Sequence, residues 1–120
     1  MKLEPIYKGP AFALYGIVQS TECLVQEFID TLPQAEQKKI IALLKRTADH
    51  GLPKNEEKFK KLWDDLFEFK TGQVRIICFF DKGRLIILTH GFLKKSQKTP
   101  RTEVEKARRL MNMYLQERGE

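Results

Sequence analysis

The sequence predicts an α+β domain in which a central β-hairpin is flanked by helices. Two apolar segments, residues 74–80 and 84–93, are separated by the turn sequence DKG, and glycine readily adopts the positive φ that such hairpin turns need. Apolar residues spaced three and four apart before this hairpin, and again after Pro100, are typical of amphipathic helices. A chain of 120 residues is the size of one domain, so we treat residues 1–120 as a single domain.

The N-terminal part predicts one strand followed by a helix. Residues 1–10 carry no clear pattern, whereas residues 11–18 are apolar and aromatic, which favours a strand. Ser20 or Thr21 can cap the start of a helix. This helix has one apolar stripe, formed by Leu24, Val25, Phe28, Ile29 and Leu32.

A second helix follows at Pro33, which ends the first helix and suits the first turn of the next. Its inward face consists of Gln37, Ile40, Ile41, Leu44 and Ala48. Gly51 and Pro53 predict where it ends. Two antiparallel helices joined by a short turn form a helical hairpin, which we expect in the N-terminal half of the chain.

The middle of the chain predicts a strand that pairs with the central hairpin. Residues 54–61 are a charged connector, and residues 62–69 alternate in a way that indicates one strand. The turn at residues 70–73 contains glycine, so the next strand should pair antiparallel. Residues 74–80 are apolar on both faces apart from Arg75, which predicts a central strand covered on both sides.

The C-terminal part predicts a last helix, with Thr99 as N-cap and Pro100 in its first turn. Its inward stripe is formed by Val104, Ala107, Met111 and Tyr114. The predicted architecture is therefore a small antiparallel sheet with an N-terminal helical hairpin and a C-terminal helix.

Several classes of protein are excluded by what the sequence lacks. It has no apolar run near the roughly 20 residues that cross a bilayer, and its first residues do not resemble a signal peptide. Cys23 and Cys78 lie within apolar patterns, so we expect buried free thiols in a cytoplasmic protein. P-loop, GxGxxG, CxxC and metal-ligand patterns are absent, so we expect no metal and no cofactor.

Positive charge is concentrated near the end of the chain. The net charge is +6, and residues 94–109 contain seven cationic and two anionic side chains, so this window carries most of the excess. A local basic patch suits a phosphate backbone or an acidic protein partner. A solvated helix face is the alternative interpretation.

Arg75 is the most informative single residue. An arginine inside an apolar strand needs a carboxylate partner or must emerge into a cleft. It can pair with Glu68 or Asp64, or it can clamp a phosphate in a functional site. His90 can titrate near neutral pH. Alternation along residues 84–93 places it on one face with Ile86, Leu88 and Phe92, where a core residue is the more common outcome.

A cluster of lysines leaves the sheet just before the last helix, where free N–H groups favour an anion. With Arg75, these are our candidate catalytic residues: Lys94, Lys95 and Lys98. We expect RNA contacts from Lys70, Gln73, Phe92, Gln97 and Arg101. RNA carries its own nucleophile, the 2′-hydroxyl, so cleavage needs proton transfer and stabilisation of negative charge rather than a metal. A lysine whose pKa is lowered by neighbouring cations can transfer the proton.

Four segments carry a resemblance to a known family: FIDTLP (28–33), KLWDDLFEF (61–69), VRIICFFDKGRLIILTHGFLKKSQKTP (74–100) and EVEKARRL (103–110). They are similar to the RelE/HigB superfamily of toxins from toxin–antitoxin modules, in particular to the HigB-like branch of phage-derived proteins. The similarity covers residues 11–115. It implies a RelE-like fold, which is a small curved antiparallel sheet with a helical hairpin packed against it.

The resemblance also implies a function and a site. The function is that of an mRNA interferase, which cleaves messenger RNA on the translating ribosome and is inhibited by a cognate antitoxin, commonly a helix-turn-helix protein. The central-strand arginine of the family matches Arg75, and its basic residues after the last strand match Lys94, Lys95 and Lys98. The sequence DLFEF stands where the RelE branch has lysines, and Tyr114 reads as helix core, so the general base is not assigned.

Two other functions fit the same resemblance. The first is a binding toxin without enzymatic activity, as in the ParE branch, which acts on DNA gyrase. The second is an inactive prophage relic that binds only its antitoxin. The enzymatic hypothesis requires Arg75 and the three lysines to share one concave surface, and it weakens if Arg75 pairs with Glu68.

Overall fold

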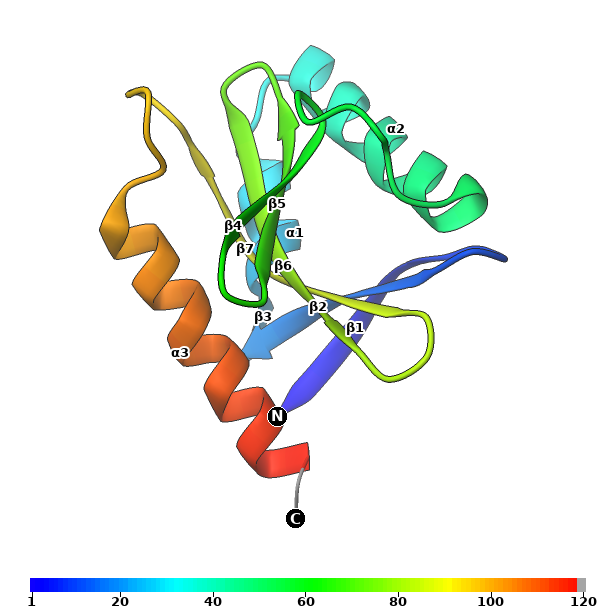
Figure 1. Cartoon of the computed structure of the whole chain (residues 1–120), viewed down its shortest axis with the longest axis vertical. Coiled ribbons are helices and arrows are strands. Elements are labelled where there is room, and N and C mark those ends of the chain that lie inside the picture. Colours follow the sequence, from blue (N-terminus) through cyan, green and yellow to red (C-terminus); the bar gives the residue numbers. More distant parts are fainter. Residues whose placement is uncertain (119–120) are drawn as a thin grey trace.

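A twisted sheet forms the centre of the molecule, with its strands in the order β1-β2-β7-β6-β5-β4 and the short β3 added to β2 (Figure 1). The structure is a computed structural model, and it describes residues 1–118. The strands are β1 (Lys2–Lys8), β2 (Ala13–Gln19), β3 (Glu22–Cys23), β4 (Phe59–Trp63), β5 (Leu66–Thr71), β6 (Val74–Asp81) and β7 (Leu85–Leu93). The helices are α1 (Leu24–Asp30), α2 (Gln34–His50) and α3 (Arg101–Arg118).

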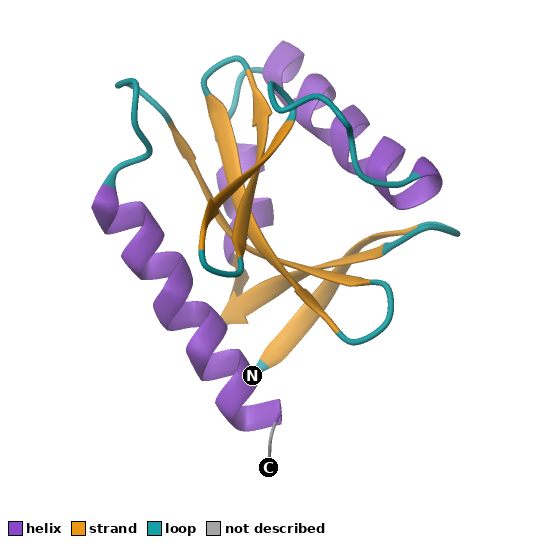
Figure 2. Ribbon diagram, in the orientation of Figure 1, coloured by secondary structure: helices purple, strands orange, loops and turns teal. Residues whose placement is uncertain are grey.

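The helices cover the sheet on two sides (Figure 2). One apolar core lies under α1 and α2 and includes Val25, Ile40 and Ile76. A second core lies under α3 and includes Ile77, Phe79 and the buried stripe of that helix. The α+β class, the central covered strand β6 and the C-terminal helix are therefore as predicted, because each follows from a local apolar pattern.

The predicted position of the helical hairpin at the N-terminus was wrong, because three strands come before the helices. Residues 2–8 form the edge strand β1. Within it, Pro5 pairs with Tyr15 next to an irregularity in the register. An edge strand tolerates proline because one side of its backbone makes no ladder bonds. The helices also pack on strands rather than forming an isolated pair, α1 mainly on β7 and α2 mainly on β1 and β5.

The sheet is mixed rather than wholly antiparallel. β2 pairs with β7 in parallel, from Ala13 opposite Leu85 to Gly16 opposite Leu88. The other neighbouring strands are antiparallel, as predicted for the central hairpin. The β5–β6 turn contains Gly72 and the β6–β7 turn contains Gly83, which adopt φ of 56° and 66°. Sequence pattern alone does not specify a pairing between segments so far apart in the chain.

The strand predicted at residues 62–69 is interrupted. Asp64 adopts φ of 51° and divides this segment into β4 and β5. β4 begins at Phe59, so part of the predicted charged connector belongs to the sheet and forms its edge next to β5. Aspartate tolerates the left-handed conformation better than most residues, which makes a turn at the two aspartates physically reasonable.

Helix capping differs from the prediction at two starts. α1 begins directly after β3, without a side-chain cap, while Ser20 adopts φ of 57° before β3. The carbonyl of Pro33 accepts the N–H groups of Glu36 and Gln37, so Pro33 lies just before α2 rather than in its first turn. The predicted end of α2 at Gly51 is confirmed.

A bulge in β7 changes which face its side chains occupy. Ile77 pairs with His90 and Cys78 pairs with Leu88, so Thr89 is the additional residue. Leu88 therefore packs under α1 and α2, whereas His90 reaches α3. The prediction that these two side chains share one face was wrong. Cys23 and Cys78 are buried free thiols, as predicted, and no helix within residues 1–118 combines the length and apolar character needed to cross a bilayer.

Candidate functional site

A cleft of about 230 Å³ lies where β4 and β5 face the loop before α3. We call it the basic cleft, and it is lined by Lys60, Lys61, Leu62, Trp63, Glu68, Lys94, Gln97, Lys98, Thr99 and Val104. Among these residues, four are lysines and Glu68 is the only carboxylate. The cleft is therefore a site of concentrated positive charge at the free edge of the sheet.

The loop between β7 and α3 is fixed at both ends by backbone hydrogen bonds. The N–H of Lys94 donates to the carbonyl of Gln73 over 2.7 Å, which extends the pairing of β7 with β6. The hydroxyl of Ser96 donates to the carbonyl of Lys98 over 2.9 Å within the loop. The carbonyl of Pro100 then accepts the N–H groups of the first turn of α3. These bonds hold the loop at residues 94–99, which we call the basic loop, beside β4 and β5.

The floor of the basic cleft is a buried polar cluster around Glu68, whose residue exposure is only 2%. Its Oε1 accepts a hydrogen bond of 3.1 Å from the hydroxyl of Thr99 and lies 3.9 Å from Nε of Arg75. The Thr99 hydroxyl is therefore bonded to Glu68 and does not cap α3, which differs from the prediction. A buried carboxylate needs such partners because desolvation penalises its charge.

Arg75 lies beneath the surface and is largely committed to its neighbours. Its Nη1 donates to the carbonyls of Gly72 and Val74, over 2.7 and 3.0 Å, and only 10% of its side chain is exposed. Its guanidinium thus stabilises the β5–β6 turn and faces Glu68. Of the partners that the sequence allowed for Arg75, the structure places this carboxylate beside it. Nε of Arg75 makes no hydrogen bond within residues 1–118 but faces Glu68, whose negative charge opposes a phosphate on that side.

Burial and the charged groups around the basic cleft shift the pKa of Lys94. Partial burial, and then the positive charges of Arg75, Lys70 and Lys60, lower the pKa of Lys94, while the Glu68 carboxylate opposes this shift. Like charges disfavour the protonated amine, and so does desolvation. Lys94 therefore has a larger neutral fraction than an ordinary surface lysine at the same pH.

The structure brings together some of the predicted site residues and separates others. Lys94, Gln97 and Lys98 line the basic cleft, where burial and the positive charges of Arg75 and Lys70 lower the pKa of Lys94. Arg75 and Lys70 are not part of its lining, and neither are the other four predicted residues: Lys95, which is exposed on the loop; Arg101, whose Nε lies 3.0 Å from Glu105; Gln73, in the exposed turn; and Phe92, which is buried under α3.

Sequence reasoning missed the residues that β4 contributes to the basic cleft. Lys60, Lys61 and Trp63 were assigned to a connector or to a continuous strand, and their approach to the loop at residues 94–99 depends on the break at Asp64. Two adjacent aspartates within an alternating segment were the available signal for that break. The signal is weak because aspartates also occur on exposed strand faces.

His90 forms a separate polar contact between the sheet and α3. Its Nε2 lies 3.0 Å from Oε1 of Glu103, and its Nδ1 lies 3.1 Å from the hydroxyl of Thr89. Burial lowers the pKa of His90, as do the charges of Lys106 and Arg109, whereas Glu103 opposes the shift. Both ring nitrogens have partners, so His90 is a satisfied core residue, as the sequence favoured.

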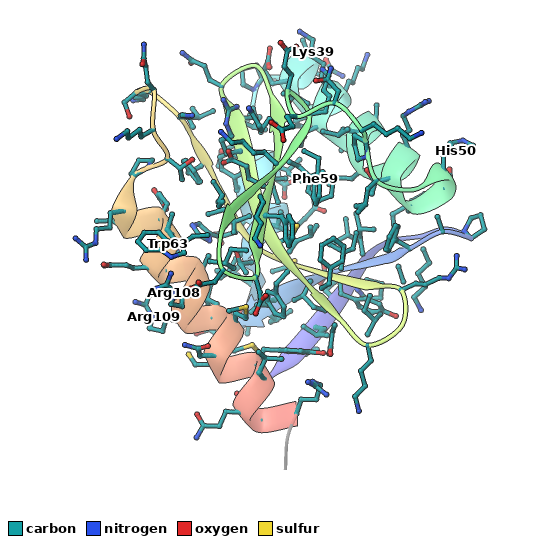
Figure 3. The ribbon with its side chains drawn as sticks, in the orientation of Figure 1. Lys39, His50, Phe59, Trp63, Arg108 and Arg109 are labelled. Atoms are coloured by element: carbon teal, nitrogen blue, oxygen red, sulfur yellow. The ribbon has the colours of Figure 1, made fainter. Side chains whose placement is uncertain are left out.

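A larger groove of about 900 Å³ lies between α2, the segment after it and the β5–β6 turn. Its lining includes Lys39 and His50, which lie toward opposite ends of α2 (Figure 3). None of the predicted site residues lines this groove. We therefore place the candidate site at the smaller basic cleft, where the chemistry-bearing residues converge.

The fold and the basic cleft define a small α+β domain with a cationic site at one sheet edge. The family described as Phage derived protein Gp49-like (DUF891) matches residues 27–112, and the chain belongs to this family. The family is RelE/HigB-like, which agrees with the resemblance at the level of the superfamily. The matched segment contains the whole basic cleft but not β1 and β2. No curated protein matches the chain.

Proposed function

We propose that the protein is the toxin of a toxin–antitoxin module and acts as an HigB-like mRNA interferase. Its family membership supports a toxin of this type. The observation that carries the enzymatic proposal is the position of Lys94, a lysine of lowered pKa that lines a cleft with three other lysines. Such a site suits the phosphate backbone of RNA together with proton transfer.

The proposed reaction uses the RNA as its own nucleophile. The 2′-oxygen bonds to the adjacent phosphorus while neutral Lys94 accepts the 2′-hydroxyl proton, and the bond from phosphorus to the 5′-oxygen breaks. The 5′-oxygen leaves with a proton from water, and the products are a 2′,3′-cyclic phosphate and a 5′-hydroxyl. Lys98 and Lys60 stabilise the negative charge that develops on the phosphate oxygens. Holding the two oxygens in line with phosphorus supplies the remaining rate enhancement.

The proposal includes the ribosome and an antitoxin as partners and therefore places the protein in the cytoplasm. A cleft lined by four lysines attracts RNA without sequence preference, and the ribosome would position the message in it. A cognate antitoxin, which we expect to be a helix-turn-helix protein, would block this cleft with acidic side chains. Charge complementarity favours such an association.

Primer extension on an abundant message tests the enzymatic proposal. The protein is expressed under control in a bacterium, and new 5′ ends inside translated codons are the expected result. Their disappearance in a Lys94→Ala variant that still folds would link the cleavage to the basic cleft. Unchanged messages in cells whose growth has stopped would exclude the nuclease.

A ParE-like toxin that binds DNA gyrase is the second candidate, and the state of Arg75 favours it. The guanidinium is occupied by two backbone carbonyls and faces Glu68, which suits a structural role better than a phosphate clamp. In this case the basic cleft is a docking surface and needs no in-line geometry. Growth arrest with intact messages and inhibited supercoiling by purified gyrase would support it. Absence of any arrest would favour the inactive relic.

A further inference from the structure

Trp63 is an exposed aromatic residue on the wall of the basic cleft. It is the single tryptophan of the chain, and its exposed fraction is 53%. A scattered exposed apolar side chain is ordinary in itself. Trp63, however, is the only aromatic among the exposed large hydrophobic residues within 1–118, and it lies beside a set of lysines.

The indole ring is held in place from one side. The guanidinium carbon of Arg108 lies 5.1 Å from the ring centroid, and Nη2 of Arg108 lies 3.1 Å from Oδ2 of Asp64. Figure 3 shows Trp63 beside Arg108, over α3. A cation over an aromatic face is attractive, and the ion pair with Asp64 fixes the cation. About half of the residue nevertheless remains exposed, so the ring is accessible to a ligand.

The charges around Trp63 suit a chain of phosphates rather than a protein surface. Lys60, Lys94 and Lys98 line the same cleft, whereas its one carboxylate, Glu68, is buried. The charge of Asp64 is offset by Arg108. Proteins that bind single-stranded nucleic acids combine a cationic groove along the backbone with aromatic rings on which bases stack.

We propose that Trp63 is the stacking platform for one unpaired base of a single-stranded RNA whose phosphates lie along Lys60, Lys94 and Lys98. This inference rests on the proposed function only in taking RNA as the ligand, and it does not require cleavage. Bases in a duplex are stacked on each other and offer no free face to an indole ring. The site therefore selects single strands.

Fluorescence of the single tryptophan reports directly on this contact. The intact protein is titrated with a 2′-O-methyl oligouridine, which has no 2′-hydroxyl and cannot be cleaved by the proposed reaction. Quenching of Trp63 emission is expected with this single strand. An abasic oligomer of the same length should bind through its phosphates without quenching, and a duplex of 2′-O-methyl RNA should quench little.

Variants separate the platform from general electrostatic attraction. Trp63→Ala should weaken binding of the oligouridine about 10- to 100-fold, measured by the anisotropy of a labelled strand, because one stacked base is lost. Trp63→Phe should retain most of the affinity. Leu52→Ala, at an exposed apolar residue in the larger groove, is the matched control and should bind as the parent protein does.

Three results would overturn the inference. These are the absence of quenching by every oligonucleotide, equal quenching by the abasic oligomer, and unchanged affinity in Trp63→Ala. Quenching only by a protein partner would instead identify this wall as a protein-docking surface. Failure of the nuclease proposal looks different: the oligouridine still quenches Trp63, but no message is cleaved in cells.

Discussion

Glu68 and Arg75 face each other across β5 and β6 beneath the basic cleft, with 3.9 Å between Oε1 and Nε. Glu68 is nearly inaccessible, and Nε of Arg75 makes no hydrogen bond within residues 1–118. The pair is therefore close enough for mutual charge stabilisation but lacks a direct hydrogen bond. Thr99 completes the surroundings of the carboxylate and ties the basic loop to the floor of the cleft.

Removing Arg75 should destabilise the fold as well as the site. Arg75→Ala leaves Glu68 buried without its nearby positive charge and leaves the carbonyls of Gly72 and Val74 without their donor. We expect the free energy of unfolding to fall by about 3 kcal/mol, measured by urea denaturation.

A double variant tests the cause of that loss. Arg75→Ala combined with Glu68→Gln removes the uncompensated charge, so the double variant should be more stable than Arg75→Ala alone. Additive losses in the two single variants would mean that the pair does not interact, and the effect of Arg75 would then be due to the turn carbonyls.

Lys94 and Lys95 form a matched pair for testing the site, because they are adjacent and differ in position. Lys94 lines the basic cleft, whereas Lys95 is exposed outside its lining. Lys94→Ala should reduce message cleavage by about 10²–10⁴-fold, since the base that accepts the 2′-hydroxyl proton is lost. Lys95→Ala should reduce it only slightly. Primer extension at matched protein levels measures both, and equal losses would argue against the cleft as the reactive site.

The pH dependence of stability should reveal His90. Burial lowers the pKa of this residue in the folded protein, so the unfolded chain binds the proton more tightly. The contribution of His90 is complete above its ordinary pKa of about 6.5 and is lost as the pH falls through that value toward the lowered one. We expect urea denaturation to give lower stability at acidic than at neutral pH.

Replacing the imidazole tests this assignment. His90→Gln should flatten the dependence of unfolding free energy on pH around the ordinary pKa of histidine. An unchanged slope in His90→Gln would assign the dependence to other groups.

Gly91 should not tolerate a side chain. A Cβ at this position would lie 2.1 Å from a ring carbon of Phe28, which packs from α1 onto β7. Gly91→Ala should therefore lower the free energy of unfolding by about 1–3 kcal/mol, because the ring must move within a packed core. Thermal unfolding measures the loss. Shortening the ring by Phe28→Leu should be less harmful in the Gly91→Ala background than alone, and strict additivity would contradict the proposed clash.

The parts of the fold that could be predicted are those with local signals. The β6–β7 hairpin follows from two apolar segments around Gly83, and α3 follows from its apolar stripe. β1 was missed because Pro5 within it and Pro10 after it argue against regular structure, and because its pairing with β2 has no local sequence signal. The bulge at Thr89 moved His90 to the other face, since one additional residue reverses the alternation of a strand.

The candidate site was predictable where it consists of consecutive residues. Lys94 and Lys98 were found because their charge is visible in the sequence, and Gln97 because it lies between them. All three line the cleft. Lys60 and Trp63 were not found, because their contribution depends on β4 folding back onto β5 after the Asp64 turn. The sequence left open whether Arg75 meets a carboxylate or a phosphate. The register of β5 with β6 sets Lys70 opposite Arg75 and places Glu68 diagonally beside it.

The parallel pairing of β2 with β7 has a consequence for synthesis of the chain. Residues 13–16 find their partners only at residues 85–88, so the pair of β1 and β2 remains without β7 until that segment has been made. Pairing between distant segments slows folding because a long loop must close first. A nascent chain that stops before β7 would have neither its completed sheet nor the loop that carries Lys94. The complete sheet, and with it the loop that carries Lys94, can therefore form only after β7 has been synthesised.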